Sequence, residues 1–331
     1  MNVNGNVQIR FDHLVLEPEE ETKRIVKDLQ NHLIGSLKRR GYIIALSGGI
    51  DSTVTAALCV RAVGPERVLG VLMPERHSAA ETAGLGEVVT AWLGIKKEVR
   101  NITPILHAAD CYKEQDEAVQ SVIPEYKPGN PFKISLPQIG EGYRIFSLTV
   151  KAEDGRMIQK RMPHTAYLQL VAATNYKQRV RKMLEYFYAD KYNYAVAGSP
   201  NRQEYDQGFF VKNGDGSADI KPIAHLYKTQ VYQLAEYLDV PEEIRSRPPT
   251  TDTYPLEQSQ EEFYFSLPFD KMDVCLYAKN NKLPVSSVCE ATGLSEDQVE
   301  FVYKDIDSKR KTTHYQHLHP ILVEKVSEIS A

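Results

Sequence analysis

The chain of 331 residues carries 40 Lys and Arg against 44 Asp and Glu, a formal net charge of −4. This balance leaves no overall basic excess, so nucleic acid is not an expected partner. The polar N-terminal segment and the lack of an apolar run of eighteen residues argue against a membrane span, and we expect a cytoplasmic protein. The four cysteines are scattered without the spacing of metal ligands, which is typical of a reducing compartment.

The first hundred residues alternate between helical and strand patterns. We predict, in chain order, a helix over Glu17–Arg40, a strand over Tyr42–Leu46, a helix over Thr53–Val63, a strand over Val68–Met73, a helix over Ala79–Leu93 and a strand near Lys97–Ile102. This alternation predicts an α/β fold with a doubly wound, mostly parallel sheet, in a single domain spanning residues 1–331. Ligands of such sheets bind beyond the carboxyl ends of the strands.

The pattern breaks between about Ser121 and Leu168, where prolines and glycines punctuate a polar stretch. The turn residues Glu153-Asp154-Gly155 lie between two strand-like runs, so an inserted loop and β-ribbon are predicted there. The two strand-like runs are Tyr143–Lys151 and Arg156–Arg161. After them we predict a helix over Leu168–Lys191, a strand over Tyr194–Ala197 and helices over Lys228–Leu238 and Phe269–Asn280. A helical tail is expected at about 285–331, with two short helices before Asp307 and Ser295 as an N-cap.

The segment Ser47–Ser52 reads Ser-Gly-Gly-Ile-Asp-Ser and joins an apolar strand to a helix. Such a turn directs backbone N–H groups from the positive end of a helix, and glycines allow close approach, so it predicts a phosphate or pyrophosphate site. The turn is not a Walker A loop, because no Gly-Lys-Ser/Thr ends it. Asp51 places a carboxylate inside this anion site, which makes sense if a divalent cation bridges it to the phosphate.

The Ser47–Ser52 string resembles the pyrophosphate loop of the N-type ATP pyrophosphatases, which cleave ATP between the α and β phosphates. Further strings resemble, in order and spacing, the motifs of the ammonia-dependent NAD synthetase family: NYKQRVR from Asn175, GSPNRQE from Gly198, GFFVKNGDGSAD from Gly208, LYKTQ from Leu226 and PPT from Pro248. The resemblance covers most of residues 19–110 and 165–312. It implies a Rossmann-like fold of the adenine nucleotide alpha hydrolase type.

The resemblance also implies roles for individual residues. The residues expected to bind ATP are Ser47, Gly48, Gly49, Asp51, Ser52, Arg179, Lys212 and Thr250. Those expected to bind the acid substrate, deamido-NAD, are Asn175, Asp215, Asp219, Lys309 and Arg310. Mg²⁺ is expected on Asp51 and Glu204, and Asp51 and Lys212 are the expected catalytic residues. Arg179 is expected to face a phosphate, as a bidentate donor does.

The implied reaction is an ATP-dependent amidation. The nicotinate carboxylate of deamido-NAD attacks the α-phosphorus of ATP, pyrophosphate leaves, and ammonia then displaces AMP to give NAD⁺. Only about forty residues precede the Ser47–Ser52 loop, too few for a glutaminase domain, so free ammonia or a separate glutaminase is the expected nitrogen source. A homodimer is what the family leads us to expect.

Three departures from the family pattern leave alternatives open. They are the insertion, Ser308 at the position of a family histidine, and the Tyr254–Glu262 segment, which matches the family only at Pro255, Gln258 and Glu261. The same chemistry on a different carboxylic acid is therefore one alternative. A non-catalytic nucleotide-binding regulator is another, because Leu283–Ser295 reads like a helix-turn-helix. The acidic residues that follow disfavour DNA as its ligand.

Overall fold

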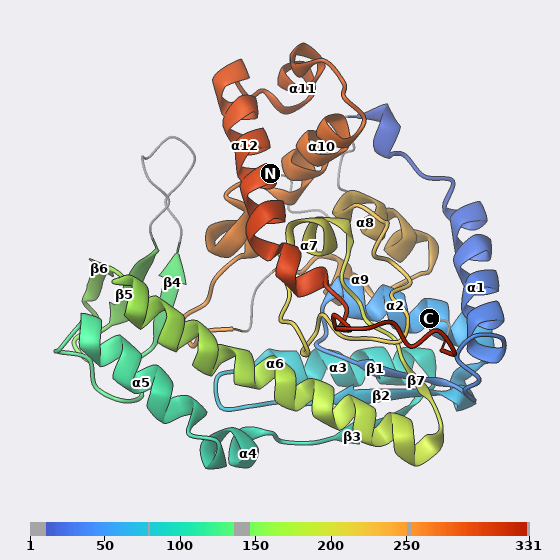
Figure 1. The fold of residues 1–331 in the computed structure, drawn as a ribbon, viewed down its shortest axis with the longest axis horizontal. Helices are drawn as coiled ribbons and strands as arrows, with labels where there is room; N and C mark the ends of the chain where they lie inside the picture. Colours follow the sequence, from blue (N-terminus) through green and yellow to red (C-terminus); the bar gives the residue numbers. More distant parts are fainter. Residues whose placement is uncertain (1–10, 79, 136–145, 250–252, 330–331) are drawn as a thin grey trace.

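The main sheet of the computed structural model has four parallel strands in the order β3-β2-β1-β7 (Figure 1). They are β1 (Tyr42–Ala45), β2 (Val68–Leu72), β3 (Lys96–Val99) and β7 (Ala195–Val196). The structure describes residues 11–78, 80–135, 146–249 and 253–329. β1 and β2 are nearly continuous apolar runs, as strands covered on both faces require. In the register, Tyr42 pairs with Val68 on one side and with Ala195 on the other.

The strand order reverses beside β1. β2 and β3 follow β1 outward in one direction, whereas β7 pairs with the opposite edge of β1. The carboxyl ends of β1 and β7 therefore flank the topological switch point of the sheet. This is the place at which open α/β sheets bind their ligands.

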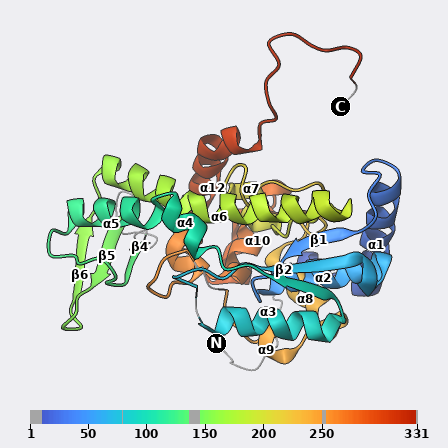
Figure 2. The ribbon, with the colours of Figure 1, turned by 90° about the horizontal axis from the view of Figure 1, so that it is seen from below.

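Helices cover both faces of the sheet, which confirms the doubly wound fold. The helices in the hydrophobic cluster on one face are α1 (Pro18–Ile34), α2 (Ile50–Val63), α3 (Ala80–Leu93), α8 (Lys228–Tyr237) and α9 (Glu242–Arg245). Those on the other face are α4 (Thr103–Ala108), the start of α5 (Cys111–Val122) and α6 (His164–Tyr192). Tyr42 and Ile44 pack into the first cluster and Ile43 into the second, as side chains that alternate along a strand must. Figure 2 shows the sheet between α6 and α3.

Several element boundaries differ from the prediction for local reasons. α1 ends at Ile34 rather than Arg40, and Lys38 then takes a left-handed conformation with φ of +50°. α2 begins at Ile50, three residues early, because Gly49 of the loop is itself the N-cap. α6 begins at His164, because Pro163 in an extended conformation precedes it. β3 ends at Val99, and the Asn101 side chain then accepts a hydrogen bond from the Thr103 N–H at the start of α4.

The insertion forms the predicted β-ribbon. β4 (Phe132–Ser135), β5 (Ser147–Lys151) and β6 (Met157–Arg161) make a three-stranded antiparallel sheet. Gly155 has φ of +85° in the turn between β5 and β6, a conformation that favours glycine. The ribbon packs against α5 (Cys111–Val122) and the start of α6. Tyr143, where the first ribbon strand was expected to begin, lies outside the described residues.

The C-terminal helices form a further hydrophobic cluster beyond the end of the sheet (Figure 1). They are α10 (Phe269–Asn280), α11 (Val285–Thr292) and α12 (Glu296–His317), preceded by a π-helix at Glu261–Phe265. Ser295 caps α12 as predicted, but α12 has 22 residues and is not the short helix expected. Its buried positions continue to Lys309 and Thr313, past the expected end at Asp307. No helix within the described ranges is long and apolar enough to cross a membrane.

A buried carboxylate joins this C-terminal layer to the sheet. Asp273 of α10 accepts hydrogen bonds from the Gln203 side chain at 2.6 Å and from the backbone N–H groups of Lys228 and Thr229 at 3.2 and 2.7 Å. Gln203 belongs to α7 (Arg202–Gln207), and the two N–H groups open α8. Asp273 therefore fixes the N-terminal turns of two helices whose side chains reach the switch point.

Replacing Asp273 with alanine is expected to lower the free energy of unfolding by about 3 kcal/mol, because it leaves buried donors of α7 and α8 without an acceptor. Urea denaturation measures this change. Asp297→Ala, at an exposed position in the first turn of α12, is the control and should change the free energy by less than about 0.5 kcal/mol. Equal effects of the two substitutions would contradict the anchoring role.

Candidate functional site

The loop after β1 and the start of α2 have the geometry that the predicted anion site requires. Gly48 has φ of +71°, and a Cβ at this position would lie 2.5 Å from the Leu85 Cβ, so only glycine fits. Ser52 Oγ donates to the Gly49 carbonyl at 3.0 Å, which holds the loop against the first turn of the helix. The N–H groups at the start of this 14-residue helix are a ready binding place for phosphate.

Two further side chains meet Asp51 beside this loop. Lys228 Nζ, from the first turn of α8, forms an ion pair with Asp51 Oδ2. Asn201 Nδ2, from the segment after β7, donates to Asp51 Oδ1 at 3.2 Å. Burial disfavours the charged amine of Lys228, but the Asp51 carboxylate outweighs this and raises the pKa of Lys228. The site therefore joins the carboxyl ends of β1 and β7 to the N-terminus of α8.

Glu204 adds a second carboxylate to this group. Asn201 and Glu204 form a capping box at the start of α7, in which Glu204 Oε2 accepts the Asn201 N–H at 3.1 Å. Glu204 Oε1 accepts a hydrogen bond from Gln260 Nε2 at 3.1 Å. Burial, and then the neighbouring Asp51 carboxylate, raise the pKa of Glu204 to about 8. Two carboxylates held this way form a site where a cation would be stabilised.

The donor set fits Mg²⁺. Within the part of the chain that the structure describes, no three His, Cys, Asp or Glu side chains gather as a metal site. Mg²⁺ is usually held by one or two carboxylates together with substrate phosphates and water, rather than by an all-protein cage. Asp51 and Glu204, beside the loop predicted to bind phosphate, match that arrangement.

A cavity of about 820 Å³ opens over the loop and contains many of the predicted residues in its wall. The predicted residues that line it are Ser47, Gly49, Asp51, Ser52, Asn175, Glu204, Asp215 and Lys309. They come from the loop, from α6, from the segments around α7 and from α12, which are far apart in the sequence. Ser308 lines the cavity as well. The structure therefore brings several residues expected to bind ATP and several expected to bind the acid substrate to one place.

Other predicted residues lie away from this cavity. Arg179 is exposed on α6 and donates to the Lys212 carbonyl at 3.3 Å, whereas Arg181 lines the cavity. Lys212 Nζ donates to the Tyr315 carbonyl at 2.9 Å, at the end of α12. Asp219 accepts the Val196 N–H at 2.7 Å beside β7. Thr250 lies outside the described residues.

Lys309 and Arg310, the two residues of α12 that were expected to bind the acid substrate, have different surroundings. Lys309 is buried, and its Nζ donates to the Tyr264 carbonyl at 2.8 Å and pairs with Asp305 at 2.9 Å. Arg310 pairs with Asp206 of α7, with Nη2 2.8 Å from Oδ2. Arg310 thus ties α12 to α7, while Lys309 reaches the cavity wall.

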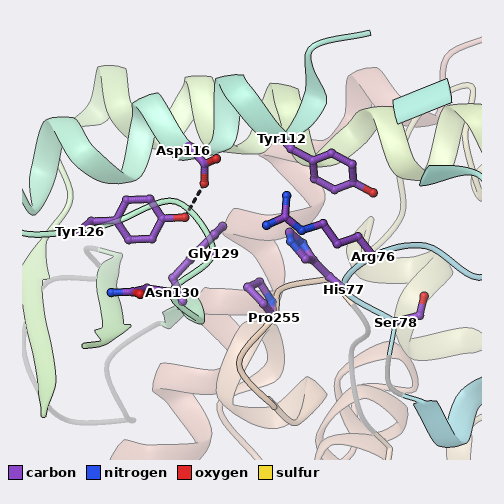
Figure 3. Close-up of a pocket in the computed structure, with 10 residues that line it drawn as sticks. Arg76, His77, Ser78, Tyr112, Asp116, Tyr126, Gly129, Asn130 and Pro255 are labelled. Atoms are coloured by element: carbon purple, nitrogen blue, oxygen red, sulfur yellow. Dashed lines mark hydrogen bonds between the residues drawn. The ribbon is translucent and has the colours of Figure 1, made fainter. Parts of the chain in front are cut away.

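A second, smaller cavity of about 340 Å³ lies beside the insertion (Figure 3). Arg76 and His77 from the segment after β2 face Tyr112 and Asp116 of α5 across it. Tyr126 donates a hydrogen bond to Asp116. Ser78 lines both cavities, so the two are neighbours.

Sequence reasoning did not single out Lys228, Asn201 or Gln260. Lys228 and Asn201 are within the strings LYKTQ and GSPNRQE, but neither string indicates that its side chain meets Asp51. The position of Lys228 could have indicated its role, because Lys228 is the first residue of a predicted helix. A side chain at this position points towards the space in front of the helix N-terminus.

The family model described as NAD synthase matches residues 21–125 and 138–318. The chain is 52% identical over 317 residues to the NH(3)-dependent NAD(+) synthetase of Mesorhizobium japonicum, covering 95% of this chain and 99% of that protein.

Two solved structures share the fold at 22% identity. The NMN synthetase from Francisella tularensis has a TM-score of 0.65, with 93% of this chain and 99% of that chain covered. The NH3-dependent NAD synthetase from Campylobacter jejuni has a TM-score of 0.61, with 94% and 100% covered. Together with the match to the family model and the close relative, the site at the switch point leads to one conclusion: the chain belongs to the NAD synthase family.

Proposed function

We propose that the protein is an ammonia-dependent NAD⁺ synthetase that uses Mg²⁺ and ATP to amidate deamido-NAD. The observation that carries this proposal is the meeting of Asp51, Glu204 and Lys228 beside the phosphate-binding loop, in a cavity of about 820 Å³. A cavity of this size is large enough for a nucleotide and part of a second substrate. The relative from Mesorhizobium japonicum, named for this activity, supports the same reaction.

The reaction needs no protein nucleophile, because ATP activates the acid. The nicotinate carboxylate attacks the α-phosphorus and pyrophosphate departs, and ammonia then attacks the acyl carbon, loses a proton and displaces AMP. The loop N–H groups and the Lys228 ammonium stabilise the negative charge on the departing pyrophosphate. Asp51 and Glu204 would hold Mg²⁺, which supplies further electrostatic stabilisation of the phosphates when bound. Arg181, in the cavity wall, would face the acid substrate. Lys309 also lies in this wall, but its Nζ already contacts the Tyr264 carbonyl, Asp305 and Gln207.

A turnover assay tests the proposal. The purified protein is incubated with Mg²⁺, ATP, ammonium and deamido-NAD, and AMP, pyrophosphate and NAD⁺ are measured together. Equal amounts of all three products are expected. Nicotinate mononucleotide serves as the competing acid, since one solved structure of the same fold is an NMN synthetase. Faster amidation of the mononucleotide would leave the proposed reaction type standing but contradict deamido-NAD as the substrate.

Lys228→Met is expected to lower kcat by about 10²- to 10³-fold, because it removes the positive charge nearest to Asp51 and the pyrophosphate site. Initial rates of pyrophosphate release measure the effect. The matched control is Lys97→Met on β3, where the lysine pairs with Glu87 at the surface. A Lys228→Met enzyme that keeps the wild-type kcat would remove Lys228 from the mechanism.

The pKa of Glu204, raised to about 8 by burial and the Asp51 carboxylate, predicts a pH dependence of Mg²⁺ binding. Below pH 8 the carboxyl is mostly protonated, so the ion must displace a proton. The affinity for Mg²⁺ together with α,β-methylene ATP should therefore fall by up to about tenfold for each pH unit below 8. Calorimetry across about pH 6.5 to 8.5 measures this. Asp51→Asn removes one ligand, so it should weaken Mg²⁺ binding at every pH. It also removes the charge that repels Glu204, so the pH dependence of the remaining affinity should move to lower pH; an unmoved dependence contradicts the assignment.

The proposed quaternary state is a homodimer formed through α6. Leu168, Tyr176, Met183 and Phe187 are exposed apolar residues of this helix. Their separations of eight, seven and four residues place them on one helix face. An apolar face of this kind on a long helix is typical of a protein interface. Arg179 lies on the same face, from which it would reach a substrate at the boundary between two copies.

Met183→Glu combined with Phe187→Glu is expected to convert the dimer into a monomer, because the two side chains are 54% and 51% exposed and form the C-terminal part of this face. Size-exclusion chromatography with light scattering measures the mass. Ile34→Glu, at the exposed end of α1, is the matched control and should remain dimeric. A wild-type monomer, or a dimeric double variant, would contradict the interface.

The last two points of the proposal are the location of the enzyme in the cell and its source of ammonia. We place the enzyme in the cytoplasm, where its free, buried thiols Cys59, Cys111 and Cys275 would remain reduced. Ammonia would come from solution or from a separate glutaminase.

A further inference from the structure

Residues 253–260 form a wall segment whose role neither the fold nor the reaction explains. Thr253, Tyr254 and Gln260 line the large cavity, whereas Pro255 lines the smaller one. Figure 3 shows Pro255 at the smaller cavity, near His77 and Asn130. The segment therefore separates the two cavities.

The first anchor of this segment is a buried ion pair. Lys177 Nζ donates to the Thr253 carbonyl at 3.0 Å and contacts Glu75 Oε1 at 2.9 Å and His77 Nδ1 at 3.1 Å. The side chains of Lys177 and Glu75 are 2% and 0% exposed. An ammonium group has three N–H donors, and three acceptors use all of them. Lys177 therefore has no donor left for a substrate, although it lines the cavity.

The second anchor is the edge of the inserted sheet. The Leu256 N–H donates to the Phe132 carbonyl at 3.1 Å, and Gln258 Nε2 donates to the Ile134 carbonyl at 2.6 Å. Both carbonyls belong to β4, and Ile134 of this strand lines the large cavity. Gln258 is buried, so its hydrogen bond is protected from water. The insertion thus provides a docking edge for the middle of the segment.

The end of the segment reaches the metal carboxylate. Gln260 Nε2 donates to Glu204 Oε1 at 3.1 Å, while the Asn201 N–H holds Oε2 at 3.1 Å. Both oxygens of Glu204 are therefore oriented, one from its own helix and one from residues 253–260. Hydrogen bonds from supporting residues are what keep a ligating carboxylate in place.

We propose that Gln260 is a positioning residue for the Glu204 carboxylate, and that Lys177 and strand β4 act through residues 253–260 to hold Gln260 in place. The inference rests on the proposed function, since it takes Glu204 as a Mg²⁺ ligand. It gives the insertion a task in the reaction, which is to fix one wall of the nucleotide cavity. It also explains why a lysine without free donors lies in that wall.

The test compares three variants: Gln260→Leu, the pair Glu75→Gln with Lys177→Met, and all three changes together. Glu75 is changed with Lys177 because a buried carboxylate without its partner would destabilise the chain on its own. Calorimetry measures the Kd of Mg²⁺ with α,β-methylene ATP, and thermal unfolding is recorded for each protein. Gln260→Leu should raise this Kd by about tenfold, the effect of one hydrogen bond to a charged group.

The double-mutant cycle decides between positioning and general loosening. If Lys177 acts through Gln260, the combined variant should bind about as weakly as Gln260→Leu, since the second change has nothing left to disturb. Steady-state kinetics should show a raised KM for ATP with a smaller change in kcat. Independent effects that multiply, or a Gln260→Leu protein with the wild-type Kd, would overturn the inference.

Two surface substitutions serve as controls. Gln159→Leu lies on the exposed strand β6, and Lys113→Met lies on α5 beside Glu117, so both should keep the wild-type Kd. A wild-type protein that does not bind the Mg²⁺ and α,β-methylene ATP probe would overturn the proposed function and the inference together. Wild-type binding with an unchanged Gln260→Leu protein would overturn the inference alone.

Discussion

The ion pair between Asp51 and Lys228 is the interaction on which the site depends. Asp51 lies at the start of α2, where the helix dipole already favours a negative charge, and Glu204 brings a second carboxylate nearby. Lys228 is the buried cation that balances these charges, and it comes from the start of α8. Because Asp51 and Glu204 follow the two strands that flank the switch point, the topology of the sheet determines where this charge cluster forms.

The sheet and its layers could be predicted from the sequence because they follow from local patterns. The apolar run of β1, the glycine-rich loop and the helix after it are contiguous, so periodicity and turn chemistry were sufficient. The ends of the helices and strands were harder to predict. Gly49 acts as an N-cap and Pro163 starts α6 early, details that depend on backbone conformation. α12 continues past Asp307 because Lys309 and Thr313 pack against other segments, a tertiary contact that no local pattern reveals.

The candidate site shows the same division. Ser47–Ser52 was predicted to be a phosphate loop from its own residues, and Glu204 was assigned a role by resemblance to a family motif. The partners of these residues are 150 or more positions away: Asn201 and Lys228 both meet Asp51 only in the folded chain. For Arg179 and Lys212 the resemblance implied a binding role, but it could not show where their side chains point. In the folded chain Arg179 is exposed, and Lys212 binds the backbone near the end of α12.

The cavity lies where separate hydrophobic clusters meet, and this explains why polar anchors matter so much here. Hydrophobic burial holds each cluster together but is non-directional, so it does not fix how one cluster is oriented against another. Buried hydrogen bonds are directional and costly to break. Asp273 joins the C-terminal helices to α7 and α8, and Gln258 joins the cavity wall to the inserted sheet. Side chains of the site that must be positioned precisely can therefore come from different clusters, because these buried hydrogen bonds hold the segments that carry them.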